Sequence, residues 1–247
     1  MIEKIKIIEL DEVDSTNDYI KRNIKIFNEN FQTVMAKNQT KGRGRKENQW
    51  KSEKDLDLTF SFVFYPTDVI KNLSPISLFV GLSVYKTINS LLKSDHLKIK
   101  WPNDILFNSR KLCGILCERI VDFNNNPVII IGIGINVNGT KNILDKKIKA
   151  ISLKNISEKN YDIKFLLNKI MINARKYLLQ YQIPLLNEIR YELIECLNSI
   201  GKEVIYYNNK SIKKEGIVSG LSNSGYLIVK DKEQQKEYEV FDVEFID

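Results

Sequence analysis

The sequence of 247 residues contains only one histidine, His96, and three cysteines. A single histidine excludes a histidine-based metal cage or a Ser-His-Asp triad built from this chain alone. Cys113 and Cys117 lie four residues apart in an expected strand, where a rise of about 3.3 Å per residue separates them by roughly 13 Å. A disulfide needs Cα atoms within about 7 Å, so we expect free cysteines. A reducing compartment, the cytoplasm, fits this pattern.

Long apolar runs and the common nucleotide-binding signature are also missing. No run of 18 apolar residues occurs, and the first six residues alternate charge with isoleucine instead of forming a signal sequence. No Gly-Lys-Ser/Thr phosphate-binding loop is present, so ATP would have to be bound by another architecture. With 43% hydrophobic residues, the chain is still able to bury a sizeable core. We therefore expect a globular protein that does not cross a membrane.

Strand and helix patterns in the first 200 residues predict an α+β fold. Alternating apolar, β-branched and aromatic residues indicate strands, and apolar residues at helical spacing indicate helices. The expected strands are 31–37, 58–65, 97–101, 105–107, 111–121 and 127–137. The expected helices begin near Thr16 and cover 74–92, 162–181 and 184–198, with Asp162 as a cap and Pro184 in a first turn. Residues 138–161 read as polar and irregular. The result is a mixed, mostly antiparallel sheet with flanking helices.

The sequence pattern changes after Gly201. Short strand patterns at 203–207, 214–221, 226–230 and 237–245 are separated by turn residues, with glycine-marked turns expected around Gly216, Gly220 and Gly225. This spacing predicts a small β-barrel. We therefore divide the chain into a domain of residues 1–199 and a C-terminal domain of residues 200–247.

One loop stands out between the strands 31–37 and 58–65. Its Gly42-Arg43-Gly44-Arg45 segment combines glycines, which let the backbone approach a ligand closely, with guanidinium groups that suit carboxylates and phosphates. Taken alone, such a segment is more often an ordinary surface turn with solvated arginines. Gln39 before it and Trp50 after it mark the two ends of this loop.

Several other polar residues stand where strands or helices begin or end. Ser15, Thr16 and Asn17 are consistent with a helix cap and also with a site for a polar ring. Pro102 ends a strand after Lys100 and Trp101, and projects Asn103 and Asp104 from the end of the sheet. Trp101 is read as core packing, whereas Asp104 is either a solvated turn residue or a carboxylate for Mg²⁺ or an amine.

The remaining motifs lie within strands. Lys111 opens the strand 111–121, where its alternative role is an exposed charge, and Gly114 marks either a bulge or a close approach. Gly132-Ile133-Gly134-Ile135-Asn136 is followed by no helix, so it is not a dinucleotide fingerprint. Its glycines suit either a flat ring lying against the backbone or a tightly packed sheet, and Asn136 is a candidate to bond a base or a phosphate.

In order and spacing, these segments together resemble the catalytic core of the biotin protein ligases. The resemblance to this family covers the chain from Ser15 to the carboxyl terminus. The resemblance implies a class II synthetase-like catalytic domain followed by a small SH3-like barrel. It implies activation of biotin with ATP to biotinyl-5′-AMP, in the presence of Mg²⁺, and transfer of biotin to a lysine of a carrier domain. The winged helix that precedes this core in some members has no counterpart here, so we expect no specific DNA binding.

The resemblance also implies roles for individual residues. Catalysis would involve Lys111, Arg45 and Asp104, with Asp104 as a contact for Mg²⁺. The implied biotin contacts are Ser15, Thr16, Asn17, Gln39, Arg43, Gly44, Arg45, Lys111 and Gly114. The implied ATP contacts are Arg45, Trp50, Lys100, Asn103, Gly134 and Asn136.

The sequence departs from the family at two places. Glu47 and Asn48 stand where a glycine and a further arginine are usual, which removes one phosphate contact and predicts a weaker hold on ATP. In the closing strand, Phe241-Asp242-Val243 lacks the glycine that commonly precedes the acidic residue.

The implied partner is a biotin carboxyl carrier protein or domain, and a homodimer is compatible with the sequence. The nearest alternative is a lipoate or octanoate ligase or transferase of the same fold, which lacks this arginine loop. The other alternative is a basic nucleic-acid-binding module. The net charge of +7, and ten Lys or Arg against three acidic residues between Lys141 and Lys176, would permit phosphate binding. The simpler explanation, which we favour, is a solvated surface in a lysine-rich chain.

Overall fold

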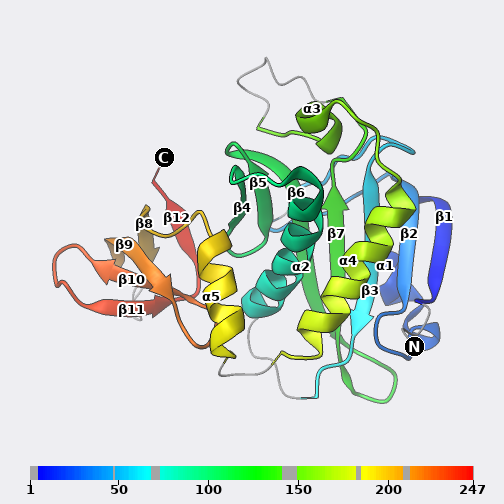
Figure 1. Ribbon diagram of the computed structural model, residues 1–247. Helices are drawn as coiled ribbons and strands as arrows, with labels where there is room; N and C mark the ends of the chain where they lie inside the picture. Colours follow the sequence, from blue (N-terminus) through cyan, green and yellow to red (C-terminus); the bar gives the residue numbers. More distant parts are fainter. Residues whose placement is uncertain are drawn as a thin grey trace.

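A computed structural model of the chain describes residues 5–46, 48–67, 73–140, 149–181, 185–207 and 212–246. Figure 1 shows a large sheet with helices packed on it and a smaller sheet at the C-terminal end of the chain. The large sheet has seven strands in the order β1-β2-β3-β7-β6-β5-β4, and the smaller one has five in the order β11-β10-β9-β8-β12.

The large sheet is mixed and mostly antiparallel, as the sequence predicts. Only β1 and β2 run parallel; every other neighbouring pair in this sheet is antiparallel. Its strands are β1 (Ile7–Val13), β2 (Thr33–Gln39), β3 (Leu58–Phe64), β4 (Leu97–Lys100), β5 (Asp104–Phe107), β6 (Arg110–Val121) and β7 (Pro127–Ile135). Asn108 and Ser109 join β5 to β6 with φ of 47° and 63°, the left-handed values that a two-residue hairpin turn requires.

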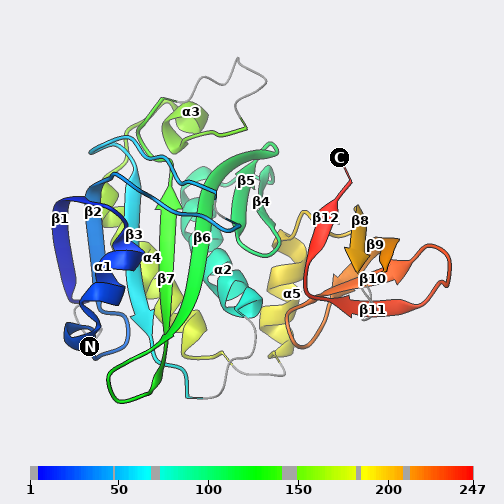
Figure 2. The same ribbon diagram turned by 180° about the vertical axis from the view of Figure 1, so that it is seen from behind.

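Helices lie on both faces of this sheet. They are α1 (Thr16–Arg22), a 3₁₀ turn (Ile24–Ile26), α2 (Ser74–Leu92), α3 (Leu153–Ser157), α4 (Ile163–Leu178) and α5 (Asn187–Cys196). Figures 1 and 2 show α2 and α4 covering one face, while α1 lies on the opposite face. The two faces therefore have different surroundings, and the face that carries α1 is largely free of helices.

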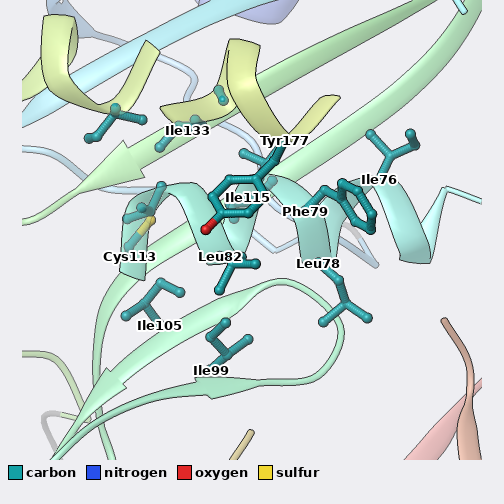
Figure 3. Packing of buried hydrophobic residues seen from close by; sticks show 14 of the residues in the cluster. Ile76, Leu78, Phe79, Leu82, Ile99, Ile105, Cys113, Ile115, Ile133 and Tyr177 are labelled. Carbon is teal, nitrogen blue, oxygen red and sulfur yellow. The ribbon is translucent and has the colours of Figure 1, made fainter. Parts of the chain in front are cut away.

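Helix α2 forms the centre of the hydrophobic core. It begins at Ser74 with Pro75 in its first turn, and Ile76, Leu78 and Phe79 are among its fully or almost fully buried residues. Its length and composition alone would allow it to cross a membrane, but 67% of the qualifying stretch is buried inside the fold. Figure 3 shows these side chains meeting residues of the sheet and Tyr177 of α4. Burying each such side chain contributes about 1.5–3 kcal/mol.

The C-terminal residues form an antiparallel sheet beside α5. Its strands are β8 (Glu203–Tyr207), β9 (Lys213–Leu221), β10 (Leu227–Asp231), β11 (Glu237–Val240) and β12 (Val243–Phe245). Trp101 is 3% exposed, and its indole N–H donates to the Gly225 carbonyl of this unit at 3.4 Å. The prediction that Trp101 is a packing residue is therefore confirmed, and its contact joins the two sheets.

Some sequence-based expectations were wrong or incomplete. Gly216 and Gly220 lie within β9 and not in turns; a Cβ at Gly216 would lie 2.3 Å from Val229 Cγ1, so glycine allows the close approach of β10. The single strand predicted at 237–245 is two strands separated by Phe241 and Asp242. The irregular region 138–161 contains α3, and β1 had not been expected. Residues 141–148 of the basic stretch, Glu47 and Pro184 lie outside the described residues.

Candidate functional site

The floor of the site is the face of β6 and β7 that points away from α2. Side chains alternate between the faces of a strand. Ile133 of β7 and Ile115 of β6 therefore pack in the core, and Gly132, Gly134 and Gly114 lie on the other face. Gly114 pairs with Gly134 in the register of the two strands. Because these three positions carry no side chain, other groups can lie directly against the backbone at the centre of the sheet.

A hairpin-like loop crosses this floor. We call it the flap: residues 42–50, of which Glu47 lies outside the described residues. The Gly44 N–H donates to the Asn48 carbonyl at 2.7 Å, and the Trp50 N–H donates to the Gly42 carbonyl at 3.0 Å. Figure 2 shows the loop between β2 and β3 passing in front of β7 and β6. The flap is thus internally hydrogen-bonded and lies on the α1 face of the sheet.

Three cations of the flap contact different parts of the fold. Arg43 places Nη2 2.7 Å from both carboxylate oxygens of Glu118 in β6. Arg45 donates to the side-chain oxygen of Asn103 at 3.2 Å. Lys46 lies 3.0 Å from Asp242 at the start of the last strand. Because each contact reaches a different element, the flap is held at three points.

The Trp50 side chain rests directly on the glycine floor. A Cβ at Gly134 would lie 2.3 Å from Trp50 Cε2, and one at Gly114 would lie 3.3 Å from Trp50 Cζ3. The indole Nε1 is buried and has no hydrogen-bond partner among the described residues. An unsatisfied buried donor costs about 1–3 kcal/mol, so this N–H is a candidate to bind a ligand acceptor.

Lys111 and Asp104 form an ion pair beside Trp50. The ammonium lies 2.7 Å from Asp104 Oδ1 and 5.8 Å from the centre of the Trp50 ring. The side chains are 38% and 23% exposed. The backbone of Lys111 is fixed independently, because its N–H donates to the Lys149 carbonyl at 2.7 Å. Lys111 is thus a partly exposed cation on a rigid strand.

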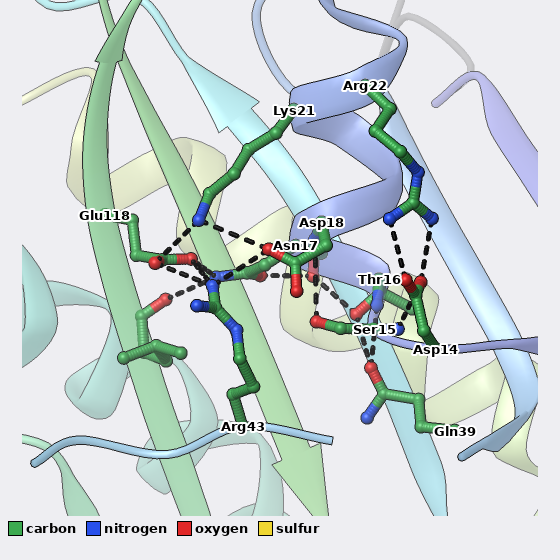
Figure 4. Close-up of polar contacts among 12 residues, drawn as sticks. Asp14, Ser15, Thr16, Asn17, Asp18, Lys21, Arg22, Gln39, Arg43 and Glu118 are labelled. Atoms are coloured by element: carbon green, nitrogen blue, oxygen red, sulfur yellow. Dashed lines mark hydrogen bonds and ion pairs between the residues drawn. The ribbon is translucent and has the colours of Figure 1, made fainter. Parts of the chain in front are cut away.

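The Ser15, Thr16 and Asn17 segment approaches the floor from the start of α1. Ser15 is the N-cap of the helix, and its hydroxyl accepts from the Asp18 N–H at 3.5 Å. The Thr16 N–H donates to the side-chain oxygen of Gln39 at 2.8 Å. All three residues of the segment are 3% exposed. Figure 4 shows them between Gln39 and Glu118, above the strands.

The structure brings most of the predicted residues to one pocket. The pocket is lined by Ser15, Thr16, Asn17, Gln39, Arg43, Gly44, Arg45, Trp50, Asn103, Lys111, Gly114, Ile115, Leu116, Gly132, Ile133 and Gly134. Lys100 and Asp104 line an adjoining cavity, which Arg45, Trp50, Asn103 and Lys111 share with the first pocket and which β12 closes on the far side. The two cavities therefore meet beneath the flap.

Asn136 is the one predicted residue that lines neither of these cavities. It is 3% exposed, and its side-chain N–H group donates to the carbonyls of Lys111 at 3.2 Å and Ile151 at 3.1 Å. Its donor group thus holds β6 and the segment before α3 in place. This supports the Lys111 backbone from below the pocket.

Glu118 is a site residue that the sequence did not single out. It accepts hydrogen bonds from Asn17 at 2.8 Å and from Lys21 at 2.8 Å, in addition to its contacts with Arg43. Burial works to raise the pKa of Glu118, but the donors from Lys21 and Asn17 and the charges of Lys21 and Arg43 more than offset it, so its pKa lies below the ordinary value. The only available signal was a pair of adjacent charged residues, Glu118 and Arg119, within the mainly apolar second half of β6.

The charges of the pocket are unevenly compensated. Arg43 is neutralised by Glu118 and Asp18, and Lys111 by Asp104. In the described part of the chain, the polar contact of Arg45 is the uncharged side chain of Asn103. Among the described residues, the pocket thus offers one cation without a carboxylate partner, Arg45, together with a second, partly exposed cation, Lys111. That arrangement is suited to binding an anion such as a carboxylate or a phosphate.

Residues 10–136, just over half of the chain, match the biotin/lipoate A/B protein ligase family, and residues 199–246 match the biotin protein ligase C terminal domain. The chain therefore has the sequence and fold of a protein ligase. The chain belongs to the biotin/lipoate A/B protein ligase family.

Similar solved structures and curated relatives show which branch of this family the chain resembles. The structure matches that of the biotin protein ligase from Aquifex aeolicus in complex with biotin and ATP, with a TM-score of 0.81 and 30% identity over 98% of both chains. The bifunctional ligase/repressor BirA of Bacillus subtilis is 35% identical over 121 residues, which cover 48% of this chain and 36% of the relative. The biotin--[acetyl-CoA-carboxylase] ligase of Mycobacterium tuberculosis is 32% identical over 107 residues, or 42% of this chain and 38% of the relative.

The matched segment thus spans less than half the length of these two curated relatives. The match to the Aquifex enzyme runs over nearly the whole of both chains. Within its family, the chain is one of the biotin protein ligases.

Proposed function

We propose that the chain activates biotin with ATP to give biotinyl-5′-AMP and pyrophosphate, and then transfers biotin to a lysine of a carrier domain with release of AMP. The observation that carries this proposal is the convergence of Arg45 and Lys111 on a glycine floor beneath the flap. Two anionic substrates need such cations in order to react. The name of the Aquifex relative, a ligase in complex with biotin and ATP, supports the same assignment.

In the first step, a biotin carboxylate oxygen attacks the α-phosphorus of ATP, and the bond to the bridging oxygen of pyrophosphate breaks. Both reactants are anionic, so they repel each other as they approach. Lys111 and Arg45 offset this repulsion, and the closed flap excludes water from the reactive mixed anhydride. The chain contributes charge and positioning, and no protein nucleophile is required.

In the second step, a neutral lysine amine of the carrier attacks the acyl carbon, AMP leaves, and the amine loses a proton. A free lysine of pKa about 10.4 is neutral only about once in 2,500 at pH 7, so a carboxylate near the amine accelerates the attack. Asp104 lines the adjoining cavity, paired with Lys111, which lines both cavities, and it takes this role in our proposal. The carrier is a biotin carboxyl carrier protein or domain.

Mg²⁺ would enter together with ATP. The described residues contain no group of three or more histidine, cysteine, aspartate or glutamate side chains that could hold a metal ion by themselves. Mg²⁺ commonly binds through one or two carboxylates together with substrate phosphates, so Asp104 with the nucleotide fits this ion. We assign the reaction to residues 1–199, with residues 200–247 as a second domain. We also propose a cytoplasmic location, because all three cysteines are free.

The test is an exchange of labelled pyrophosphate into ATP, followed by transfer of labelled biotin to a purified carrier domain. We expect exchange that depends on biotin and label that appears on the carrier only when ATP and magnesium are present. Parallel reactions contain lipoate or octanoate in place of biotin. Exchange with these acids but not with biotin would reassign the chain to the lipoate branch of the family, and no exchange with any acid would refute the proposal.

A further inference from the structure

A buried polar row lies beneath the pocket. In the register of the sheet, Ser61 of β3 and Leu116 of β6 both pair with Gly132 of β7. Asn17 occupies the space above Gly132, because a Cβ there would lie 2.3 Å from Asn17 Oδ1. The Asn17 carboxamide therefore packs on the backbone of β7, between residues of β3 and β6.

The orientation of the Asn17 carboxamide is fixed by Glu118. Its side-chain nitrogen donates to Glu118 Oε2 at 2.8 Å, with the Leu116 carbonyl at 3.4 Å. An ionised carboxylate only accepts hydrogen bonds, so the N–H₂ end of Asn17 must face Glu118. The Asn17 carbonyl oxygen must then face Ser61, and the two oxygens lie 2.6 Å apart.

The direction of the remaining hydrogen bonds follows from counting protons. The Ser61 hydroxyl lies 2.6 Å from the Thr16 hydroxyl as well as from Asn17 Oδ1, and the Thr16 hydroxyl lies 3.0 Å from Gln39 Oε1. Three oxygen–oxygen contacts thus share two hydroxyl protons, one from Thr16 and one from Ser61. The two contacts of 2.6 Å are the short ones, and each needs a proton between its oxygens. The Asn17 carbonyl oxygen has no proton, so Ser61 must donate to Asn17, and Thr16 must then donate to Ser61. Gln39 Oε1 does not need the Thr16 hydroxyl proton, because it already accepts a hydrogen bond from the Thr16 backbone N–H at 2.8 Å.

The Thr16 hydroxyl proton is thereby directed away from the pocket, and the pocket side of this oxygen is left as an acceptor. Thr16 lines the pocket, whereas Ser61 is fully buried below it. We propose that Ser61 and Glu118 are positioning residues that set the direction of this hydrogen-bond chain, so that Thr16 accepts from an N–H group of the ligand. This inference rests on the proposed function, in which that N–H belongs to the ureido ring of biotin.

The test uses Ser61→Ala, Thr16→Val and the double variant, with biotin-dependent pyrophosphate exchange as the assay. Loss of one buried hydrogen bond is expected to raise the KM for biotin about tenfold in Ser61→Ala. The KM for ATP should remain within about twofold, because none of the residues in this hydrogen-bond chain is among the implied ATP contacts. In the Thr16→Val background, Ser61→Ala should have little further effect on the KM for biotin, since Ser61 acts through Thr16.

Glu118→Gln provides a second variant with a matched control. Asp18 contacts the same two cations as Glu118, Arg43 at 3.1 Å and Lys21 at 3.3 Å, but the described contacts of Asn17 do not include it. Asp18→Asn therefore removes the same charge and leaves the Asn17 carboxamide in place. We expect Glu118→Gln to raise the KM for biotin at least threefold more than Asp18→Asn does.

The outcomes separate this inference from the proposed function. Absence of biotin-dependent exchange in the wild type refutes the proposed function and this inference with it. Normal wild-type exchange with an unchanged biotin KM in Ser61→Ala, or additive effects in the double variant, overturns the inference alone. If Ser61→Ala does not fold, equal effects of Glu118→Gln and Asp18→Asn overturn it instead.

Discussion

Replacement of Lys111 by alanine tests the electrostatic account most directly. The change removes an ammonium that lies 2.7 Å from Asp104 and leaves the backbone contacts of this position intact. Two unit charges of the same sign about 4 Å apart repel by about 4 kcal/mol at the effective dielectric constant near a protein surface, about 20. If Lys111 offsets this repulsion between carboxylate and α-phosphate, its loss raises the barrier by a similar amount. At about 1.36 kcal/mol for each factor of ten, adenylate formation slows about a thousandfold.

The fold should survive this change. The Lys111 and Asp104 side chains are 38% and 23% exposed, and exposed ion pairs contribute about 0–1 kcal/mol to stability. The assay is kcat/KM for biotin-dependent pyrophosphate exchange, measured alongside thermal unfolding. Lys111→Arg keeps the charge and should recover part of the rate.

A matched control is available on the same sheet. Lys98 of β4 pairs with Leu106, which in turn pairs with Lys111, but its ammonium donates to the Glu195 carbonyl at 3.3 Å and does not line the pocket. Lys98→Ala should leave exchange unchanged. Wild-type rates in Lys111→Ala, or equal losses in both variants, would show that Lys111 does not act through its charge in the site.

Three further predictions concern the floor, the ion network and the core. Gly134→Ala places a Cβ 2.3 Å from the Trp50 ring, so the flap should be displaced and become more sensitive to limited proteolysis, whereas a wild-type cleavage rate would contradict the packing. The pKa of Glu118 is lowered by folding, so its contribution to stability is complete above the ordinary glutamate pKa of 4.5 and is lost as the pH falls through the lower folded-state value. The difference in unfolding free energy between wild type and Glu118→Gln should therefore be constant from about pH 6 to 8 and shrink below about pH 4.5. Phe79→Ala should destabilise the fold by about 3–5 kcal/mol in chemical denaturation, and a loss below about 1 kcal/mol would contradict its place in the core.

Much of the fold was predictable because local patterns and tertiary packing agree. Helix α2 has both an opening Ser74-Pro75 and a broad apolar face, and the turn between β5 and β6 begins with Asn108, a residue type that adopts left-handed backbone readily. Strand β1 was missed because it pairs only with β2 and is half exposed, so its charged residues hide the strand pattern. Helix α3 was missed because it has five residues, too few to show helical periodicity, and is capped locally by Ser152.

The candidate site shows the same division. Its glycines and cations lie in short segments whose order in the chain is itself informative, so Lys111 and Gly134 were identifiable from the sequence. Ser61 and Glu118 have no local motif, and their importance arises from strand register, which brings them to Asn17 from distant parts of the chain. The sequence also could not show that the side-chain nitrogen of Asn136 donates to two carbonyls of the protein itself, because these contacts too depend on the fold.

The contact between Trp101 and Gly225 has a mechanical consequence. The indole is 3% exposed, and a Cβ at Gly225 would lie 3.0 Å from the side chain of Pro75, at the first turn of α2. The small sheet therefore packs against the start of α2 and the turn that follows β4, which fixes its position relative to the large sheet. Any protein that binds there would contact a surface formed by both sheets in a fixed arrangement. We also expect the two sheets to unfold in a single thermal transition.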